Sequence, residues 1–322
     1  MRAFAYSRPA SLDEALALLG ASARPLAGGT DLLTLMKADL LAPERLVAIA
    51  PLLPSGIARD AEGVTIGAAT TLADIERDPT LAQRFTALGQ AAGVAATPQL
   101  RNMATLGGNL LQRPRCWYFR NRLAQCWLKG GTACHAREGE NRQHALFGGS
   151  GCVAVHPSDL APALLAFGAS ARVRGAHGER IVPLEEFFSL PTGERRSETR
   201  LRDGELVLQV SMPSYPEETR SLYLKEMDRR AFAFALASVA AVVRVSARQR
   251  IGHVRLVLGG VAPIPWRAHG AERVLLGEEA DERLIEAAAD AAAEGAVPLK
   301  GNAFKLPLLK ALARRALRSL LL

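Results

Sequence analysis

Residues 97–110 read TPQLRNMATLGGNL, and residues 156–162 read HPSDLAP. Together these two stretches enclose every cysteine of the chain, namely Cys116, Cys126, Cys134 and Cys152. Free cysteines that serve only to fill a hydrophobic core behave as small apolar residues, so they need not be concentrated in one segment. Their concentration in one window therefore indicates a specific chemical purpose.

The charge of the chain is concentrated in the same segment. The net charge is +8, which on its own first suggests a nucleic-acid partner. Between positions 112 and 150, however, seven basic residues stand against two acidic ones, which is most of the surplus. Because this positive charge coincides with the cysteines, we expect it to compensate an anionic group bound there. We do not expect a nucleic-acid partner.

Length and hydropathy define the broad class. A chain of 322 residues suits two or three domains, and an apolar fraction of 49% is typical of a soluble globular protein. No apolar stretch is long enough to span a bilayer, and the first nine residues lack the apolar core of a secretory signal. We therefore expect no membrane span and no signal peptide.

Capping boxes with Ser11 and Thr71 as the cap residues, together with hydrophobic periodicity, predict an α+β chain. The expected helices cover residues 12–19, 32–38, 81–93, 160–167, 281–295 and 306–321. The expected strands cover residues 24–27, 45–49, 56–59, 64–68, 205–210, 221–227, 234–245 and 250–260. Residues 214–218 read as a linker, and long antiparallel strands followed by helices predict a separate C-terminal domain.

Two Gly-Gly loops stand out in the N-terminal half. A short strand runs into Gly28-Gly29-Thr30-Asp31, and residues 105–109 read TLGGN. Glycines let the backbone approach a phosphate closely, although either pair alone is more often an ordinary turn. Two such loops in one domain, each beside a hydroxyl residue, indicate a diphosphate held from two sides. No G-x-G-x-x-G follows the first strand, which disfavours a Rossmann site.

The cysteine spacing, C-x9-C-x7-C-x17-C, leaves three interpretations open. Disulfides do not fit a long chain with only four cysteines and no secretory signal. Structural zinc usually shows a tight knuckle such as C-x2-C, which is missing. An iron–sulfur cluster also takes four thiolates with looser spacing, and the basic surroundings would offset its negative charge. Spacing and charge favour the cluster but leave zinc possible.

Several motifs resemble one known family. Residues 25–32 (PLAGGTDL), 99–110 (QLRNMATLGGNL) and 158–160 (SDL) resemble the FAD-binding medium subunits of molybdenum hydroxylases, the xanthine dehydrogenase and carbon monoxide dehydrogenase family. Tyr223-Leu224-Lys225, with Arg229 and residues 233–235, is similar to the start of that family's C-terminal domain. The resemblance covers nearly the whole chain. It implies a two-subdomain, PCMH-type FAD-binding domain at 1–215 and a smaller α+β domain at 216–322 with an antiparallel sheet and helices.

The cysteine segment, an insertion at about 111–152, resembles a narrower group. Residues 115–120 (RCWYFR) and 138–142 (EGENR) are similar to the flavin subunit of bacterial three-subunit aldehyde oxidoreductases, which carries an extra [4Fe-4S] cluster. The flavin subunit of 4-hydroxybenzoyl-CoA reductase is similar in this respect. The resemblance implies that Cys116, Cys126, Cys134 and Cys152 ligate a [4Fe-4S] cluster. We expect Arg115, Arg120 and Arg142 to offset its charge.

The resemblance also implies which residues contact FAD. Ala27, Gly28, Gly29, Thr30, Asp31 and Leu32 would form the first pyrophosphate loop, and Thr105, Gly108 and Asn109 the second. Asp159 with Leu160 would lie on the ribose and adenine or the ribityl side, and Lys225 near the isoalloxazine. Two alternatives stay open here, because Asp159 also suits a helix N-cap and Lys225 also suits a surface lysine.

The function implied is an electron-transfer subunit with FAD and a [4Fe-4S] cluster. Its partners would be a molybdenum-cofactor subunit, a small [2Fe-2S] subunit and an external electron acceptor, with an aldehyde as the expected substrate. The chain itself would supply no catalytic residue. The alternatives are a 4-hydroxybenzoyl-CoA reductase-like flavin subunit and a zinc-binding scaffold. We expect the chain in the cytoplasm, or in the periplasm after export with a partner.

Overall fold

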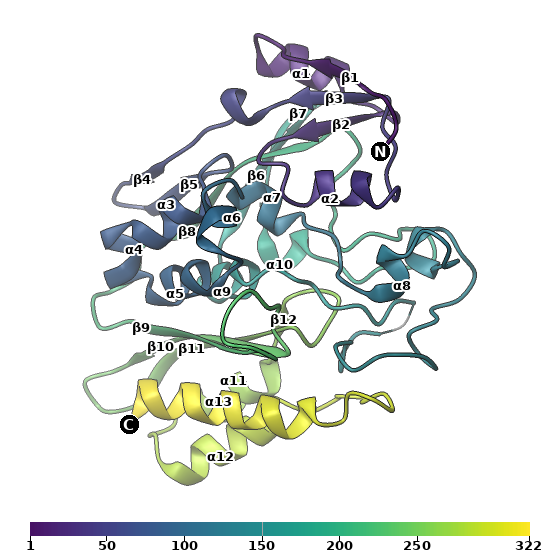
Figure 1. The fold of residues 1–322 in the computed structure, drawn as a ribbon. Coiled ribbons are helices and arrows are strands. Elements are labelled where there is room, and N and C mark those ends of the chain that lie inside the picture. Colours follow the sequence, from purple (N-terminus) through teal and green to yellow (C-terminus); the bar gives the residue numbers. More distant parts are fainter. Residues whose placement is uncertain (150) are drawn as a thin grey trace.

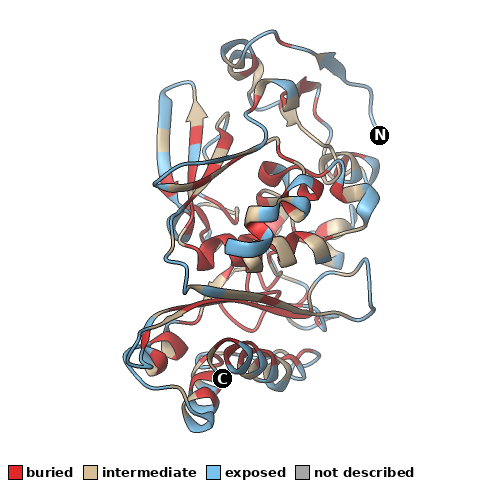
Figure 2. Cartoon of the chain, turned by 90° about the vertical axis from the view of Figure 1, so that its left-hand side faces the viewer, coloured by how far each residue is buried: buried red, intermediate tan, exposed pale blue. Residues whose placement is uncertain are grey.

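The computed structural model describes residues 1–149 and 151–322. Residue 150, which falls inside the predicted insertion, lies outside the described residues. The described residues form three sheets, arranged one after another from the N-terminal end of the molecule to the C-terminal end (Figure 1). A layer of short helices, which lies between the second and the third sheet, contains much of the buried core (Figure 2).

The first sheet is small and parallel, with strand order β1-β3-β2. Strands and helices alternate along this part of the chain: β1 Ala5–Ser7, α1 Leu12–Leu18, β2 Ala23–Leu26, α2 Leu32–Lys37 and β3 Arg45–Ala48. Ser11 caps α1 as predicted, because its Oγ accepts a hydrogen bond of 3.1 Å from the backbone N–H of Glu14. The carboxyl end of β2 leads straight into the first Gly-Gly loop, which precedes α2.

The second sheet is antiparallel, with strand order β4-β5-β8-β6-β7. Its strands are β4 Ile57–Arg59, β5 Gly63–Gly67, β6 Ser170–Gly175, β7 Gly178–Pro183 and β8 Leu206–Pro213. The β6–β7 hairpin was not predicted. Most residues of β7 are exposed and two of them, Glu179 and Arg180, are charged, so this edge strand lacks the apolar alternation that marks a half-buried strand.

Short helices cover this second sheet. Their bounds are α3 Leu72–Arg77, α4 Pro79–Arg84, α5 Thr86–Val94, α6 Pro98–Arg101, α7 Leu106–Leu110, α9 Leu160–Ala166 and α10 Leu184–Phe187. The single helix predicted over 81–93 is instead two helices, α4 and α5, which break at Phe85. At this break the ring of Phe85 packs edge-on against that of Phe167, with the ring centroids 5.0 Å apart.

The C-terminal part confirms the predicted antiparallel sheet with helices. Its sheet has the order β12-β11-β10-β9, and its bounds are β9 Arg220–Glu226, β10 Ala237–Val245, β11 Ile251–Gly259, β12 Trp266–Arg267, α11 His269–Leu275, α12 Glu282–Ala291 and α13 Lys305–Leu321. Helices α5 and α9 contact this sheet, and α11 and α13 also pack on it. Strand β10 is buried along most of its length because the side chains on both of its faces are covered.

The predicted insertion projects to one side of the molecule, next to α2 (Figure 1). Its described residues contain little regular structure: helix α8 Trp117–Arg120 and the 3-10 helix Trp127–Lys129. A further 3-10 helix, Ala50–Leu52, follows β3. A small core fixes the insertion, in which Phe119 and Leu128 pack with Cys126, Cys152 and with Leu35 of α2. Among the described residues, no helix is both long and apolar enough to cross a membrane.

A buried lysine joins the insertion to the C-terminal helices. Lys305, at the start of α13, is fully buried, and its Nζ donates to the carbonyl oxygens of His144 at 2.9 Å and Gly260 at 2.6 Å. Asn302 donates to the same His144 carbonyl at 3.0 Å. Burial lowers the pKa of Lys305 from 10.5 to about 7.

We expect Lys305→Met to remove a pH dependence of stability. Because the folded-state pKa lies below the unfolded-state value, the unfolded chain binds more protons between pH 7 and 10.5. The free energy of unfolding of the unchanged chain should therefore rise with pH in this window relative to the variant, by up to about 1.4 kcal/mol per pH unit. Denaturant unfolding at pH 7 and pH 9 measures this difference.

Lys310→Met, on the same helix, is the matched control for losing a lysine from α13. The gap between the unchanged chain and Lys305→Met should widen towards pH 9. A gap that stayed constant across the two pH values would contradict the depressed pKa of Lys305.

Candidate functional site

The first Gly-Gly loop is pressed against the segment that leads into the second. A Cβ atom added to Gly28 would lie 1.8 Å from the backbone oxygen of Met103, so only glycine fits there. Gly29 has φ +71°, a left-handed conformation that side chains disfavour. Close packing against the backbone of Met103 therefore explains Gly28, and the left-handed backbone conformation explains Gly29.

The second loop is organised by Thr105. Thr105 forms an antiparallel bridge with Thr71, and its Oγ1 accepts a hydrogen bond of 3.3 Å from the N–H of Gly108 at the start of α7. A Cβ atom on Gly108 would meet only this hydroxyl, at 3.1 Å, and otherwise open space. Asn109 Oδ1 accepts from Ser158 Oγ at 2.6 Å, which joins the second loop to residues 156–160.

Two cavities lie on either side of the paired loops. The smaller, of about 350 Å³, has mostly apolar walls and is lined by Ala27, Gly28, Gly29, Leu32 and Thr105 among others. The larger, of about 460 Å³, is lined by Asn109, Asp159, Phe232 and Phe234 among others. Both cavities share a wall that consists of Thr30, Asp31, Gly108 and Gln112.

This geometry fits FAD. The cofactor has two large halves joined by a diphosphate, and the structure has two cavities joined at a wall of backbone and small residues. The wall includes Gly108, where a side chain would enter the cavity space rather than meet protein. The predicted contact residues from Ala27 to Leu32, together with Thr105, Gly108 and Asn109, all line one or both cavities.

Asp159 and Lys225 form a buried ion pair at the larger cavity. Lys225 Nζ donates to Asp159 Oδ2 at 2.8 Å, and the Tyr223 hydroxyl donates to Oδ1 at 2.7 Å. Burial raises the pKa of Asp159, and the Lys225 charge opposes this shift. The side chain of Lys225 is only 2% exposed, so the surface-lysine alternative is wrong.

The helix-cap alternative for Asp159 is also wrong. Asp159 precedes α9 but its side chain makes no capping bond, and Ser158 Oγ instead accepts from the N–H of Ala161 at 3.0 Å. Leu160 is fully buried in the core around α9 and is not among the residues that line either cavity. Asp159 therefore lies on the wall of the larger cavity, whereas Lys225, like Leu160, is not among the residues that line either cavity and reaches the wall only through its ion pair with Asp159.

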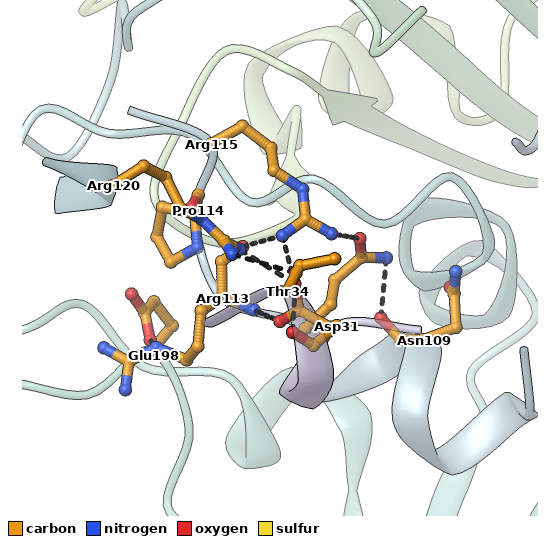
Figure 3. Close-up of polar contacts among 9 residues, drawn as sticks. Asp31, Thr34, Asn109, Arg113, Pro114, Arg115, Arg120 and Glu198 are labelled. Atoms are coloured by element: carbon orange, nitrogen blue, oxygen red, sulfur yellow. Dashed lines mark hydrogen bonds and ion pairs between the residues drawn. The ribbon is translucent and has the colours of Figure 1, made fainter. Parts of the chain in front are cut away.

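The carboxylate of Asp31 is occupied by hydrogen bonds from the cysteine insertion (Figure 3). Its Oδ1 accepts from the guanidinium groups of Arg115 and Arg120, the latter at 2.8 Å, and its Oδ2 accepts from the backbone N–H of Arg113 at 2.8 Å. Arg142 pairs with Asp228 at 2.8 Å. The three arginines expected to offset a cluster's charge thus have carboxylate partners within the protein.

The four cysteines are free thiols that gather in the insertion. Cys126 and Cys152 are buried, and Cys116 and Cys134 are half-buried. Burial raises the pKa of Cys116 to about 11, and Cys126 and Cys134 add to this rise through their charges. A hydrogen bond from Cys152 lowers the pKa of Cys134 to about 5 and raises that of Cys152. The thiols therefore lie near enough to act on one another.

Histidines accompany the cysteines without completing a metal site. His144 Nε2 lies 3.2 Å from Cys116 Sγ, and burial lowers the pKa of His144 to about 4. His156 is buried and its Nε2 lies 3.2 Å from the backbone oxygen of Leu110. Throughout the described chain, no group of three or more His, Cys, Asp or Glu residues is arranged to hold a metal ion. The described residues thus contain gathered thiols but no preformed mononuclear metal site.

Sequence reasoning assigned no role to several residues that line the larger cavity. These are Gln112, Gln143, Asp228, Phe232 and Phe234, beside Arg229, and Arg115 lines this cavity too although it was expected only to offset the charge of a cluster. Phe232 has φ +52°, and Arg229 donates through Nε to its carbonyl oxygen at 3.0 Å, which shapes the loop between β9 and β10. The sequence signal for this loop was the motif of Arg229 and residues 233–235, which resembles the start of the family's C-terminal domain.

The comparisons with known proteins agree with this geometry. The model of the FAD binding domain in molybdopterin dehydrogenase matches residues 2–215, and that of the CO dehydrogenase flavoprotein C-terminal domain matches residues 222–320. The chain is 37% identical over 327 residues to the aldehyde oxidoreductase FAD-binding subunit PaoB of Escherichia coli K12, covering 100% of this chain and 98% of PaoB.

Carbon monoxide dehydrogenase is similar in sequence and in structure. The medium chain from Hydrogenophaga pseudoflava is 32% identical over 326 residues, covering 98% of this chain and 96% of that protein. A solved structure of the enzyme from this organism, lacking the Mo-pyranopterin moiety, superimposes with a TM-score of 0.76 at 31% identity and covers 98% of this chain and 96% of that one.

The chain thus belongs to the FAD-binding medium subunits of the molybdenum hydroxylase family. Its relatives are FAD subunits of oxidoreductases, and this chain is an FAD-binding oxidoreductase subunit of the same kind. Within the family it is similar over its whole length to the flavin subunit of an aldehyde oxidoreductase.

We expect Gly108→Val to keep the fold but lose FAD. Its side chain would enter the space shared by the two cavities, whereas a side chain on Gly28 would strike backbone and destabilise the loop itself. FAD affinity should fall at least about tenfold, which corresponds to about 1.4 kcal/mol. Fluorescence titration of the flavin-free chain, with circular dichroism to check the fold, measures both quantities.

Gly193→Val provides the matched control, because a Cβ there meets nothing within 4 Å. It should bind FAD like the unchanged chain. If Gly108→Val bound FAD equally well, the wall between the two cavities would not be the cofactor site.

Proposed function

We propose that this chain is the FAD-carrying and [4Fe-4S]-carrying electron-transfer subunit of a molybdenum-dependent aldehyde oxidoreductase. The observation that carries the proposal is the full-length similarity, at 37% identity, to the FAD-binding subunit of an aldehyde oxidoreductase. The paired cavities and the gathered free thiols support the two cofactor assignments separately. We propose domain limits of 1–215 and 216–322.

The FAD contacts follow from the cavity walls. In this proposal the diphosphate lies over the shared wall and is held by the loops from Ala27 to Leu32 and from Thr105 to Asn109. The isoalloxazine half occupies the larger cavity, where Phe232 and Phe234 offer aromatic surface and the Asp159–Lys225 pair lies at the wall. The apolar smaller cavity takes the other half of the cofactor.

The buried ion pair has a positioning role in this proposal. Lys225 and Tyr223 both bind Asp159 and keep its carboxylate in one place, and Lys225 also donates to the carbonyl oxygen of Val94 at 3.2 Å. Removing either partner would leave a buried charge without compensation, which usually costs about 3–5 kcal/mol. This chain therefore supplies a fixed, pre-formed wall beside the flavin, while bound FAD supplies the redox chemistry.

The cluster proposal assigns Cys116, Cys126, Cys134 and Cys152 as its four ligands. Four thiolates suit a [4Fe-4S] cluster, whose irons keep the thiolates further apart than one metal ion does. That difference is compatible with four thiols that influence one another without forming a mononuclear site. His144 lies against Cys116 as a hydrogen-bonding neighbour.

The partners are proposed from the family. The relatives named above are medium chains and FAD-binding subunits of larger enzymes. We place a molybdenum-cofactor subunit and a small [2Fe-2S] subunit beside this chain. Electrons from an aldehyde would reach this subunit through those partners and leave to an external acceptor.

We expect this chain by itself to carry about four iron and four acid-labile sulfide beside one FAD, in addition to the iron and sulfide of the partner [2Fe-2S] subunit. Metal analysis, sulfide analysis and the visible spectrum of the subunit, purified anaerobically and separated from its partners, measure these contents. Cys126→Ser should lower the iron content of this chain. One zinc per chain without iron would contradict the cluster and favour a zinc scaffold.

We expect aldehyde to reduce the native complex and an external acceptor to reoxidise it. In complexes assembled with the Gly108→Val chain, aldehyde should still reduce the partner iron–sulfur clusters, but acceptor turnover should fall at least about tenfold, in step with FAD affinity. Stopped-flow absorbance separates the two steps. Failure of every aldehyde tested to reduce the unchanged complex would contradict the substrate class and favour a reductase of the 4-hydroxybenzoyl-CoA type.

A further inference from the structure

Asp31 belongs to the shared wall of the two cavities, yet its carboxylate is engaged by the insertion. Its side chain is 15% exposed, and those of Arg115 and Arg120 are 27% and 18% exposed. Arg120 also donates to the carbonyl oxygens of Pro114 at 2.8 Å and Arg113 at 2.9 Å. These partly buried contacts hold three parts of one short segment against a single carboxylate (Figure 3).

The segment held in this way is the one that carries the first cysteine. Arg115 precedes Cys116, and Arg120 ends helix α8, where its backbone N–H donates to the carbonyl oxygen of Cys116 at 2.9 Å. Both ends of residues 115–120 are therefore fixed to Asp31. Any loosening of the cysteine segment reaches the first Gly-Gly loop through these two arginines.

Arg115 extends the connection to the rest of the cavity wall. Its Nη2 donates to Gln112 Oε1 at 3.0 Å, and its guanidinium carbon lies 4.9 Å from the centre of the Phe234 ring. Gln112 Nε2 in turn donates to the carbonyl oxygen of Asn109 at 2.9 Å. One side chain of the insertion thus contacts the first loop, the segment after the second loop and the β9–β10 loop.

From these contacts we infer that the cysteine insertion and FAD bind cooperatively, with Asp31, Arg115 and Arg120 as the latch between them. Asp31 is a positioning residue, which orients the first Gly-Gly loop for the diphosphate without spending its carboxylate on the cofactor. Order in the insertion raises FAD affinity, and bound FAD orders the insertion by the same factor, because coupling between two sites is reciprocal. The inference rests on the proposed FAD site at the shared wall.

The latch and a simple charge effect predict opposite results for Asp31→Asn. An acidic group beside an anionic diphosphate repels it, so on charge alone its removal should tighten FAD binding. The latch predicts weaker binding, because an uncharged amide no longer holds two guanidinium groups in place. The direction of the change in FAD affinity therefore distinguishes the two explanations.

The test is a double-mutant cycle between Asp31→Asn and Arg120→Met, read as the dissociation constant of FAD on the full chain. Arg120 is the better arginine for the cycle because it is not among the residues lining either cavity. We expect each single variant to weaken FAD binding about 5- to 150-fold, and the double variant to be no weaker than the poorer single one. Additive losses, or tighter binding by Asp31→Asn, would overturn the latch.

Arg122→Met is the matched control within the same insertion. Its side chain is 63% exposed and lies 3.7 Å from Asp39, so it removes the same charge two residues away without touching Asp31. FAD affinity should stay within about twofold of the unchanged chain, as is usual for exposed substitutions. A loss equal to that of Arg120→Met would mean that only the loop's overall charge matters, and the latch would be wrong.

A second measurement, proteolysis with and without FAD, separates coupling between the insertion and FAD from simple unfolding of the insertion. In the unchanged chain, FAD should slow proteolytic cleavage within residues 111–152, and this protection should disappear in Asp31→Asn and Arg120→Met. Arg120→Lys keeps the charge but not the forked geometry, so it should fold and lose less affinity than Arg120→Met. FAD-dependent protection that persists in all three variants would overturn the inference.

The cycle also separates this inference from the proposed function. An unchanged chain that bound no FAD would overturn the cofactor site and the latch together. An unchanged chain that bound FAD, with variants that bound it equally well, would overturn the latch alone. The absence of iron would overturn the cluster and leave the cycle fully readable.

Discussion

The structure depends first on the contact between the backbone of Gly28 and the backbone oxygen of Met103. No side chain fits between them, because a Cβ on Gly28 would lie 1.8 Å from that oxygen. This contact brings the loop after β2 against the segment that leads into α7. The two cavities acquire a common wall as a result, and a diphosphate site at that wall needs both loops at once.

The basic residues near this wall are paired with carboxylates, although the composition shows only an excess of positive charge. The basic surplus of the insertion does not face open solvent as a uniform patch. Arg115 and Arg120 bind Asp31, and Arg142 binds Asp228, so each has a defined carboxylate partner. The pair of Lys225 and Asp159 follows the same rule in a more buried place, where an unpaired charge would be far more costly.

Local signals made part of the site predictable. Both Gly-Gly loops could be recognised from the sequence because each is a pair of adjacent glycines beside a hydroxyl residue, and the capping signals at Ser11 and Thr71 marked helix starts. The close contact between Gly28 and the backbone of Met103 is a tertiary requirement that no local pattern shows. The break at Phe85 and the β6–β7 hairpin were not predictable in this way. The residue at the break, Phe85, packs against a distant ring, Phe167, and the hairpin includes an exposed edge strand with little apolar pattern.

The sequence by itself determined the α+β class, the presence of two Gly-Gly loops and the concentration of the four cysteines in one basic segment. These are properties of composition, spacing and local backbone preference. Only the tertiary structure decided what Asp31, Asp159 and Lys225 do, because each is defined by a partner from another part of the chain. Asp31 meets arginines more than 80 residues away, and Asp159 meets Lys225 across the boundary between the helix layer and the last sheet. Such pairings follow from how the sheets and the insertion pack, which no local pattern encodes.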